Sequence, residues 1–228
     1  MPAFTNVPWI SETPDSGTLA AGGSQNIQVT VNTTGMAPGV YQATLTFRTD
    51  SGRQPNISVP VRLVVSAYQQ GFNAGGSAYT DGVGDPWATD RAYTAANGSG
   101  YVQSPPKSVS TKDPIAGTTD DPLYQAARIT PMNYRFTGLP AGTYAVELRF
   151  AEIQNKKPGQ RQFDVIVNGT PYLIALDIAA QVGKNTALDK SLFVPVTAGG
   201  EISVQLAARR SFGDPILNAV RVTHRPDH

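Results

Sequence analysis

The sequence contains no cysteine, and this absence removes several chemistries at once. Without thiols the chain can form no disulfide, bind no metal through thiolates and use no cysteine nucleophile. Histidine is almost as scarce, because the only two, His224 and His228, lie at the C-terminal end beyond the last expected strand. The body of the protein therefore has no histidine to offer to a Ser-His-Asp triad or to a histidine-based metal site.

Charged residues and long apolar runs are also scarce. Charged residues make up 15 % of the chain, the formal net charge is +1, and no lysine–arginine stripe carries interleaved aromatics. Nucleic acid and anionic membranes are therefore not expected as partners. No apolar run approaches the roughly 20 residues that span a bilayer, so membrane insertion is not expected. The first ten residues lack a signal peptide, and we interpret Met1 as a start placed on a fragment of a longer multidomain chain.

Glycine and proline, by contrast, are abundant. The 228 residues include 22 glycines and 18 prolines, and 40 % of the residues are hydrophobic. This balance favours many short strands joined by tight turns over long charged helices. The length suits one large or two medium domains, each with a real core. We therefore expect an all-β protein made of two β-sandwich units.

The clearest alternating pattern covers residues 144–151 and 163–168. In the first run, one set of alternate positions is apolar and includes Tyr144, Val146, Leu148 and Phe150. Alternation with period two places every second side chain on one face of a pleated sheet, so each run should bury one face. The polar segment 154–160 between them suits the loop of an antiparallel hairpin. We expect the two runs to pair with each other.

Residues 1–67 show three further alternating strands, at 27–31, 41–47 and 59–65. Their expected inward sets begin with Ile27, Val29 and Val31. Three or four strands are fewer than the roughly seven of an immunoglobulin-like sandwich. The segment that starts at Pro8-Trp9 resembles the C-terminal part of bacterial immunoglobulin-like repeats. It implies a partial Ig-like spacer, and the alternative is a small β-subdomain complete in itself.

The chain changes character after Tyr68. Residues 70–121 are rich in Gly, Asp, Ser, Thr and Pro, and little regular structure is expected there. A stretch of that length without regular structure is usually functional or disordered. Beyond the two runs described above, strands are expected at 171–176, 188–196, 202–206 and 216–222, and no amphipathic helix is evident.

Several short motifs follow one another in a distinctive order in residues 68–228. They are Phe72-Asn73-Ala74-Gly75-Gly76, Tyr79-Thr80-Asp81, Leu123-Tyr124-Gln125, Phe150-Ala151-Glu152-Ile153, Gly159-Gln160-Arg161-Gln162-Phe163-Asp164-Val165 and Asn168-Gly169. This ordered set resembles the malectin domain. The resemblance implies a jelly-roll β-sandwich that binds carbohydrate without catalysis through loops at one end. The resemblance also implies that, in bacteria, such a domain is usually appended to a larger secreted or surface protein.

The resemblance also suggests which residues contact a ligand. Members that bind sugar use aromatic platforms and an aspartate, because C–H faces of a sugar ring stack on aromatic rings and carboxylates fix hydroxyls. The aspartate matches Asp214, and either Tyr101 or Tyr93 stands for a family tyrosine. Two aromatic positions are replaced, since Ile129 follows Arg128 and the pair after the FAEI motif is Gln154-Asn155. We expect Tyr101, Tyr93, Asp214, Arg128, Gln154 and Asn155 at the ligand end.

Two other candidates come from the loop-rich region. Trp87 is expected either to present its ring to a ligand or to plug the sandwich. Asn73 is expected to contact a ligand or to support a turn with the glycines that follow it. Five aspartates are of a type that Ca²⁺ prefers, but they lack EF-hand spacing, and turn capping is the simpler explanation: Asp81, Asp85, Asp90, Asp120 and Asp121. No metal site and no cofactor is expected, with a structural calcium ion as the alternative.

These observations favour a non-catalytic glycan-binding module of a secreted or cell-surface protein, with an oligo- or polysaccharide as partner. The alternative is a structural or adhesion module that makes protein–protein contacts, which the replaced aromatics favour. An enzyme fragment would need two carboxylates about 5–9.5 Å apart. Glu147 and Glu152 lie at an odd separation and should point to opposite faces, so catalysis is not expected.

Overall fold

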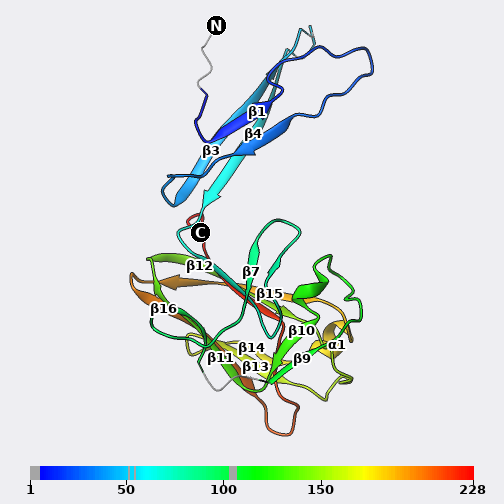
Figure 1. The fold of residues 1–228 in the computed structure, drawn as a ribbon, viewed down its shortest axis with the longest axis vertical. Helices are drawn as coiled ribbons and strands as arrows, with labels where there is room; N and C mark the ends of the chain where they lie inside the picture. The colour runs from blue at the N-terminus through cyan, green and yellow to red at the C-terminus, as the bar shows by residue number, and fades with distance from the viewer. Residues whose placement is uncertain (1–5, 51, 54, 103–106) are drawn as a thin grey trace. The chain divides into compact units, whose positions relative to one another are not determined.

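The computed structural model describes residues 6–50, 52–53, 55–102 and 107–228 (Figure 1). The chain divides into two compact units, residues 1–65 with Asp227 and residues 66–226 with His228. Strands dominate both units, as the sequence predicts. The described residues contain one short α-helix, α1 (Ile178–Val182), and one 3-10 helix, η1 (Asp121–Leu123). Neither has the length and apolar character that crossing a bilayer requires.

The N-terminal unit consists of two two-stranded antiparallel sheets. Strand β1 (Ile10–Thr13) pairs with β2 (Gln28–Val31), and β3 (Gly39–Arg48) pairs with β4 (Asn56–Val65). Trp9 is buried, with its ring edge-to-face to Tyr41 at 6.5 Å. The three predicted strands are present, but the prediction that Ile27, Val29 and Val31 point inward is wrong, because these side chains are 36 to 43 % exposed. Two strands per sheet are too few to cover this apolar set.

The C-terminal unit is a β-sandwich whose larger sheet has six strands in the order β15-β12-β18-β5-β7-β6. Their bounds are β5 (Gln69–Asn73), β6 (Tyr79–Thr80), β7 (Pro86–Thr89), β12 (Gly142–Phe150), β15 (Leu188–Val196) and β18 (Ala219–His224). Neighbours are antiparallel except β5 and β7, which are parallel. The first strand of the unit, β5, lies directly beside the last, β18.

The opposing sheet has five strands in the order β14-β13-β16-β11-β8, and a smaller sheet has the order β17-β10-β9. The five are β8 (Ser99–Tyr101), β11 (Met132–Leu139), β13 (Phe163–Val167), β14 (Thr170–Leu176) and β16 (Gly200–Ala208). The three are β9 (Lys107–Ser110), β10 (Ala126–Ile129) and β17 (Ile216–Leu217). The prediction of little regular structure over residues 70–121 is wrong, since β5 to β9 lie there. These strands have at most five residues, too few for alternation to be visible.

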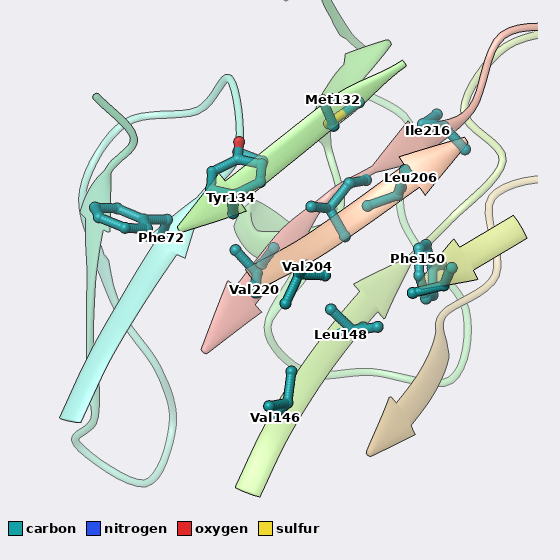
Figure 2. Packing of buried hydrophobic residues seen from close by; sticks show 14 of the residues in the cluster. Phe72, Met132, Tyr134, Val146, Leu148, Phe150, Val204, Leu206, Ile216 and Val220 are labelled. Carbon is teal, nitrogen blue, oxygen red and sulfur yellow. The ribbon is translucent and has the colours of Figure 1, made fainter. Parts of the chain in front are cut away.

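Large apolar side chains from both main sheets fill the space between them (Figure 2). Rings from the two sheets face one another, with centroids 5.9 Å apart for Phe72 and Phe136 and also for Phe150 and Phe163. Each fully buried side chain of this kind contributes about 1.5–3 kcal/mol relative to exposure. The predicted inward set of residues 144–150 is buried, as are the alternate residues 163, 165 and 167.

The predicted hairpin, however, does not form. Strand β12 pairs with β15 and β18, whereas β13 pairs with β14 and β16 in the opposite sheet. Residues 151–162 therefore cross from one sheet to the other instead of joining neighbours. Alternation specifies which face of a strand is buried, and both arrangements bury the same faces. It does not specify the neighbouring strand.

Candidate functional site

Three connecting segments meet at the end of the sandwich where residues 151–162 cross between the sheets. The β16–β17 loop joins this crossing, because Gly213 N donates to Gln160 O over 2.9 Å. The β10–β11 connection joins the same loop, because Thr130 N donates to Pro215 O over 3.3 Å. We call residues 128–131, 151–162 and 209–215 the Asp214 loop cluster.

Asp214 itself is exposed and forms no ion pair with any residue that the structure describes. Arg209, its neighbour in the loop, instead donates twice to Asp164, over 2.8 and 3.0 Å. A carboxylate is an acceptor only, with room for several donors. The Asp214 carboxylate is therefore placed to accept hydrogen bonds from hydroxyl groups of a ligand.

Gln154 and Asn155 each use the amide oxygen to bind a cationic side chain. Gln154 Oε1 accepts from Arg161 Nη2 at 2.6 Å, and Asn155 Oδ1 accepts from Lys184 Nζ at 2.8 Å. The NH₂ group of each amide remains as its donor. The cluster thus combines a carboxylate acceptor with two amide donors, which is a set that suits a polyhydroxylated ligand.

A buried ion pair lies beneath the crossing loop. Arg161 Nε is 2.9 Å from Glu152 Oε2, and both side chains are almost inaccessible. Burial raises the pKa of Glu152 and lowers the pKa of Arg161, even though each partner opposes the effect on the other. The loop is held at a second point by Asp177, whose carboxylate accepts from Gly159 N at 2.6 Å and caps α1 through Ala180 N. Such supports keep a binding loop in one conformation.

The backbone of the cluster departs from ordinary geometry at two non-glycine residues. Thr130 has a φ of 116° and Ser211 a φ of 72°. Positive φ is strained for residues with a side chain, and for a β-branched residue such as Thr130 it is an outlier. The surrounding hydrogen bonds therefore impose the course of these two connections.

Tyr101 lies against Arg128, the first residue of this cluster. Arg128 donates to Asp90 through both Nε, at 2.9 Å, and Nη2, at 2.8 Å. Tyr134 Oη adds a third donor at 2.7 Å, and Gly75 N a fourth at 3.3 Å. The half-buried Tyr101 ring lies 5.5 Å from the Arg128 guanidinium carbon. Hydrogen bonding to Asp90 raises the pKa of Arg128. The Arg128 guanidinium is therefore engaged by contacts within the protein.

Three further candidates are placed by structural contacts. The prediction that Trp87 presents its ring is wrong, because the residue is 1 % exposed and the Arg221 and Arg149 guanidinium groups lie 4.8 and 5.8 Å from the ring centroid. Asn73 is also buried and donates to Ser77 O and Pro122 O, so it supports a turn. Tyr93 is half-buried, with the Arg135 guanidinium 5.2 Å from its ring centroid.

The five aspartates considered for calcium all accept hydrogen bonds from the protein. Their donors include Trp87 Nε1 for Asp81, Arg221 for Asp85, Arg128 for Asp90, Tyr79 Oη for Asp120 and Ile115 N for Asp121. Within the described ranges, no three histidine or acidic side chains are grouped as metal ligands. These carboxylates therefore hold loops and strand ends of the unit together.

Sequence reasoning passed over one residue of the cluster, Phe212. Phe212 is 37 % exposed and lies in the same loop as Asp214. An aromatic residue flanked by serine, glycine and aspartate in a connection between strands was the available signal. Single exposed aromatics are common on protein surfaces, so the signal is visible only once the loop is placed.

A family model described as "Malectin domain" matches residues 68–220, and one described as "Viral BACON domain" matches residues 3–61. Mouse malectin (Mus musculus) is 31 % identical over 139 residues, which cover 58 % of this chain and 46 % of that protein. Receptor-like protein 4 of Arabidopsis thaliana is 30 % identical over 152 residues, covering 61 % and 24 %. The chain spans less than half of the length of these relatives.

Solved structures share the fold at lower identity. A Bacteroides uniformis β-glucuronidase superposes with a TM-score of 0.60 at 19 % identity, over 89 % of this chain and 24 % of that one. The ANX2 ectodomain from Arabidopsis thaliana superposes with a TM-score of 0.57 at 19 % identity, over 68 % and 49 %.

Proposed function

Because the chain belongs to the malectin domain family, we propose that residues 68–228 form a non-catalytic module that binds an oligo- or polysaccharide through the Asp214 loop cluster. The observation that carries this proposal is the exposed, unpaired Asp214 carboxylate beside a loop that presents Gln154 and Asn155. Carbohydrate recognition needs acceptors and donors for hydroxyl groups, and these three side chains supply both.

The rigidity of the cluster supports the same function. Hydrogen bonds from Gly213 and Gly159, together with the buried Glu152–Arg161 pair, hold the loops before any ligand arrives. A preformed site loses less conformational entropy on binding, so the hydrogen bonds it makes are expressed more fully as affinity.

We further propose that the module belongs to a larger secreted or cell-surface protein, of bacterial type, in which residues 1–67 act as an Ig-like spacer. Two of the related names support an extracellular setting, namely a receptor-like protein and an ectodomain. The match to most of this chain within a Bacteroides enzyme supports an accessory module attached to a glycan-active protein.

The second candidate is an adhesion module that binds another protein. The half-buried Ile129 and the polar Gln154-Asn155 pair favour it, because these positions offer no aromatic ring for stacking on sugar. A partner captured by the folded chain and not released by free sugars would support this alternative.

Glycan-array screening of the whole folded chain, followed by calorimetric titration of the best ligand, tests the leading proposal. Asp214→Ala should weaken binding roughly 10- to 150-fold, because a hydrogen bond to a charged group contributes about 1.5–3 kcal/mol. Asp15→Ala is the matched control, since Asp15 is an exposed aspartate of the other unit. Absence of binding across plant, bacterial and animal glycans would sink the proposal, and unchanged binding by Asp214→Ala would place the ligand elsewhere.

A further inference from the structure

Exposed aromatic side chains are rare in this protein. Among the phenylalanine, tyrosine and tryptophan residues that the structure describes, only Phe193 and Phe212 are more than about a third exposed, at 52 % and 37 %. Every other described ring is buried or half-buried. Exposure of an aromatic ring on this surface is therefore an exception.

The two exposed rings differ in their surroundings. Phe193 stacks on His228, with ring centroids 4.1 Å apart and planes inclined by 24°. Phe212 has no such neighbour among the described residues, for neither a ring contact nor a cation above its ring is found there. Its apolar face therefore remains accessible to a ligand.

Phe212 is also fixed relative to the polar groups of the Asp214 loop cluster. Its N–H donates to Arg209 O over 3.1 Å, and the next residue, Gly213, is bonded to Gln160 O. The preceding residue, Ser211, has the positive φ noted above. The ring is thus held in a defined turn, two residues before Asp214, and its position does not depend on a flexible segment.

We propose that Phe212 is the stacking platform of this site and that its ligand is a pyranose ring presenting a face of C–H groups. This inference rests on the proposed function and assigns a specific contact within it. Two residues of chain separate the Phe212 and Asp214 α-carbons by at most about 7 Å. One sugar ring, or two adjacent rings, can therefore stack on Phe212 while a hydroxyl group donates to Asp214.

Calorimetric titration of the whole chain with its best array ligand tests the assignment with three variants. Phe212→Ala should weaken binding roughly 10- to 100-fold, because the apolar contact is lost. Phe212→Trp should retain binding. Phe193→Ala, which removes the other exposed ring, should bind like the wild type.

A spectroscopic readout separates a contact from a structural role. Ligand added to Phe212→Trp should shift the tryptophan emission to shorter wavelength, whereas the wild-type emission should not shift, because Trp87 and Trp9 are buried. If Phe212→Ala proves unstable, the emission shift of Phe212→Trp alone decides whether residue 212 contacts the ligand. If the wild type binds, the affinity of Phe212→Ala is within twofold of it, and the emission of Phe212→Trp does not shift, then Phe212 is not the platform. The proposed function would still stand. A folded wild type that binds no glycan overturns both.

Discussion

Asp90 is the acceptor at the centre of a buried polar network in the C-terminal unit. Its side chain is inaccessible and receives hydrogen bonds from Arg128, Tyr134 and Gly75. Asp90→Asn keeps the shape but removes the charge and replaces an acceptor oxygen with a donor that faces other donors. Breaking a buried ion pair by removing one partner costs about 3–5 kcal/mol. For a unit of this size, that corresponds to a fall of roughly 6–20 °C in Tm.

Guanidinium denaturation followed by tryptophan fluorescence can measure this cost in one unit alone. The chain has two tryptophans, and Trp9→Phe leaves Trp87 as a reporter within the C-terminal unit. Asp90→Asn would be compared with its parent in this background. Tyr134→Phe removes one donor to the carboxylate and leaves the ion pair, so it should cost about 1.5–3 kcal/mol.

The matched control is Glu201→Gln, which breaks the exposed ion pair with Arg135. The two side chains are 45 and 39 % exposed, and exposed pairs contribute about 0–1 kcal/mol. A loss below about 1 kcal/mol for Asp90→Asn, equal to that of the control, would refute the view that this carboxylate organises the network.

Three other predictions concern the same unit. Gly71→Ala should cost about 1–3 kcal/mol and perturb Trp87 fluorescence, because the added Cβ would lie 3.0 Å from Trp87 Cε3; unchanged stability and emission would contradict the packing described. Leu148→Ala should lower the free energy of unfolding by about 2–5 kcal/mol in denaturant titrations, since it leaves a cavity in the core. Burial raises the pKa of Asp164, but hydrogen bonds from the Ala175 N–H and from Arg209 together outweigh burial. The net effect is a pKa below the ordinary 3.8. Its stabilisation is therefore complete above pH 3.8 and lost as pH falls through the lower folded value. The denaturation midpoint should therefore fall less between pH 6 and pH 3 for Asp164→Asn than for the wild type. An equal fall in both would exclude this contribution.

The fold illustrates what alternation in a sequence can and cannot predict. Alternation predicted which side chains of residues 144–150 enter the core, because burial of one face is a local property of a strand. It predicted the wrong partner for that strand, because β12 meets β18, about 70 residues further along the chain. Pairing over that separation depends on the whole sandwich, and no local pattern encodes it.

The site divides in a similar way. Asp214, Gln154 and Asn155 were selected by resemblance to a family. The contacts of Gln154 with Arg161 and of Asn155 with Lys184 could not be inferred from spacing. Trp87 was a candidate because its surroundings are polar in sequence. One of those polar residues, Asp81, accepts a hydrogen bond from the indole N–H, and Trp87 is buried. Composition near a residue therefore did not predict its exposure.

The place of β18 in the larger sheet has a consequence for biosynthesis. Residues 219–224 are synthesised after every other strand of the unit, yet they lie between β12 and β5 and pair with both. Until they emerge, the nascent sheet consists of two halves, each with an open edge to which another chain could add. The larger sheet can be completed only after β18 has been translated. We therefore expect the yield of folded protein to depend on how well the open edges are shielded from other chains during synthesis.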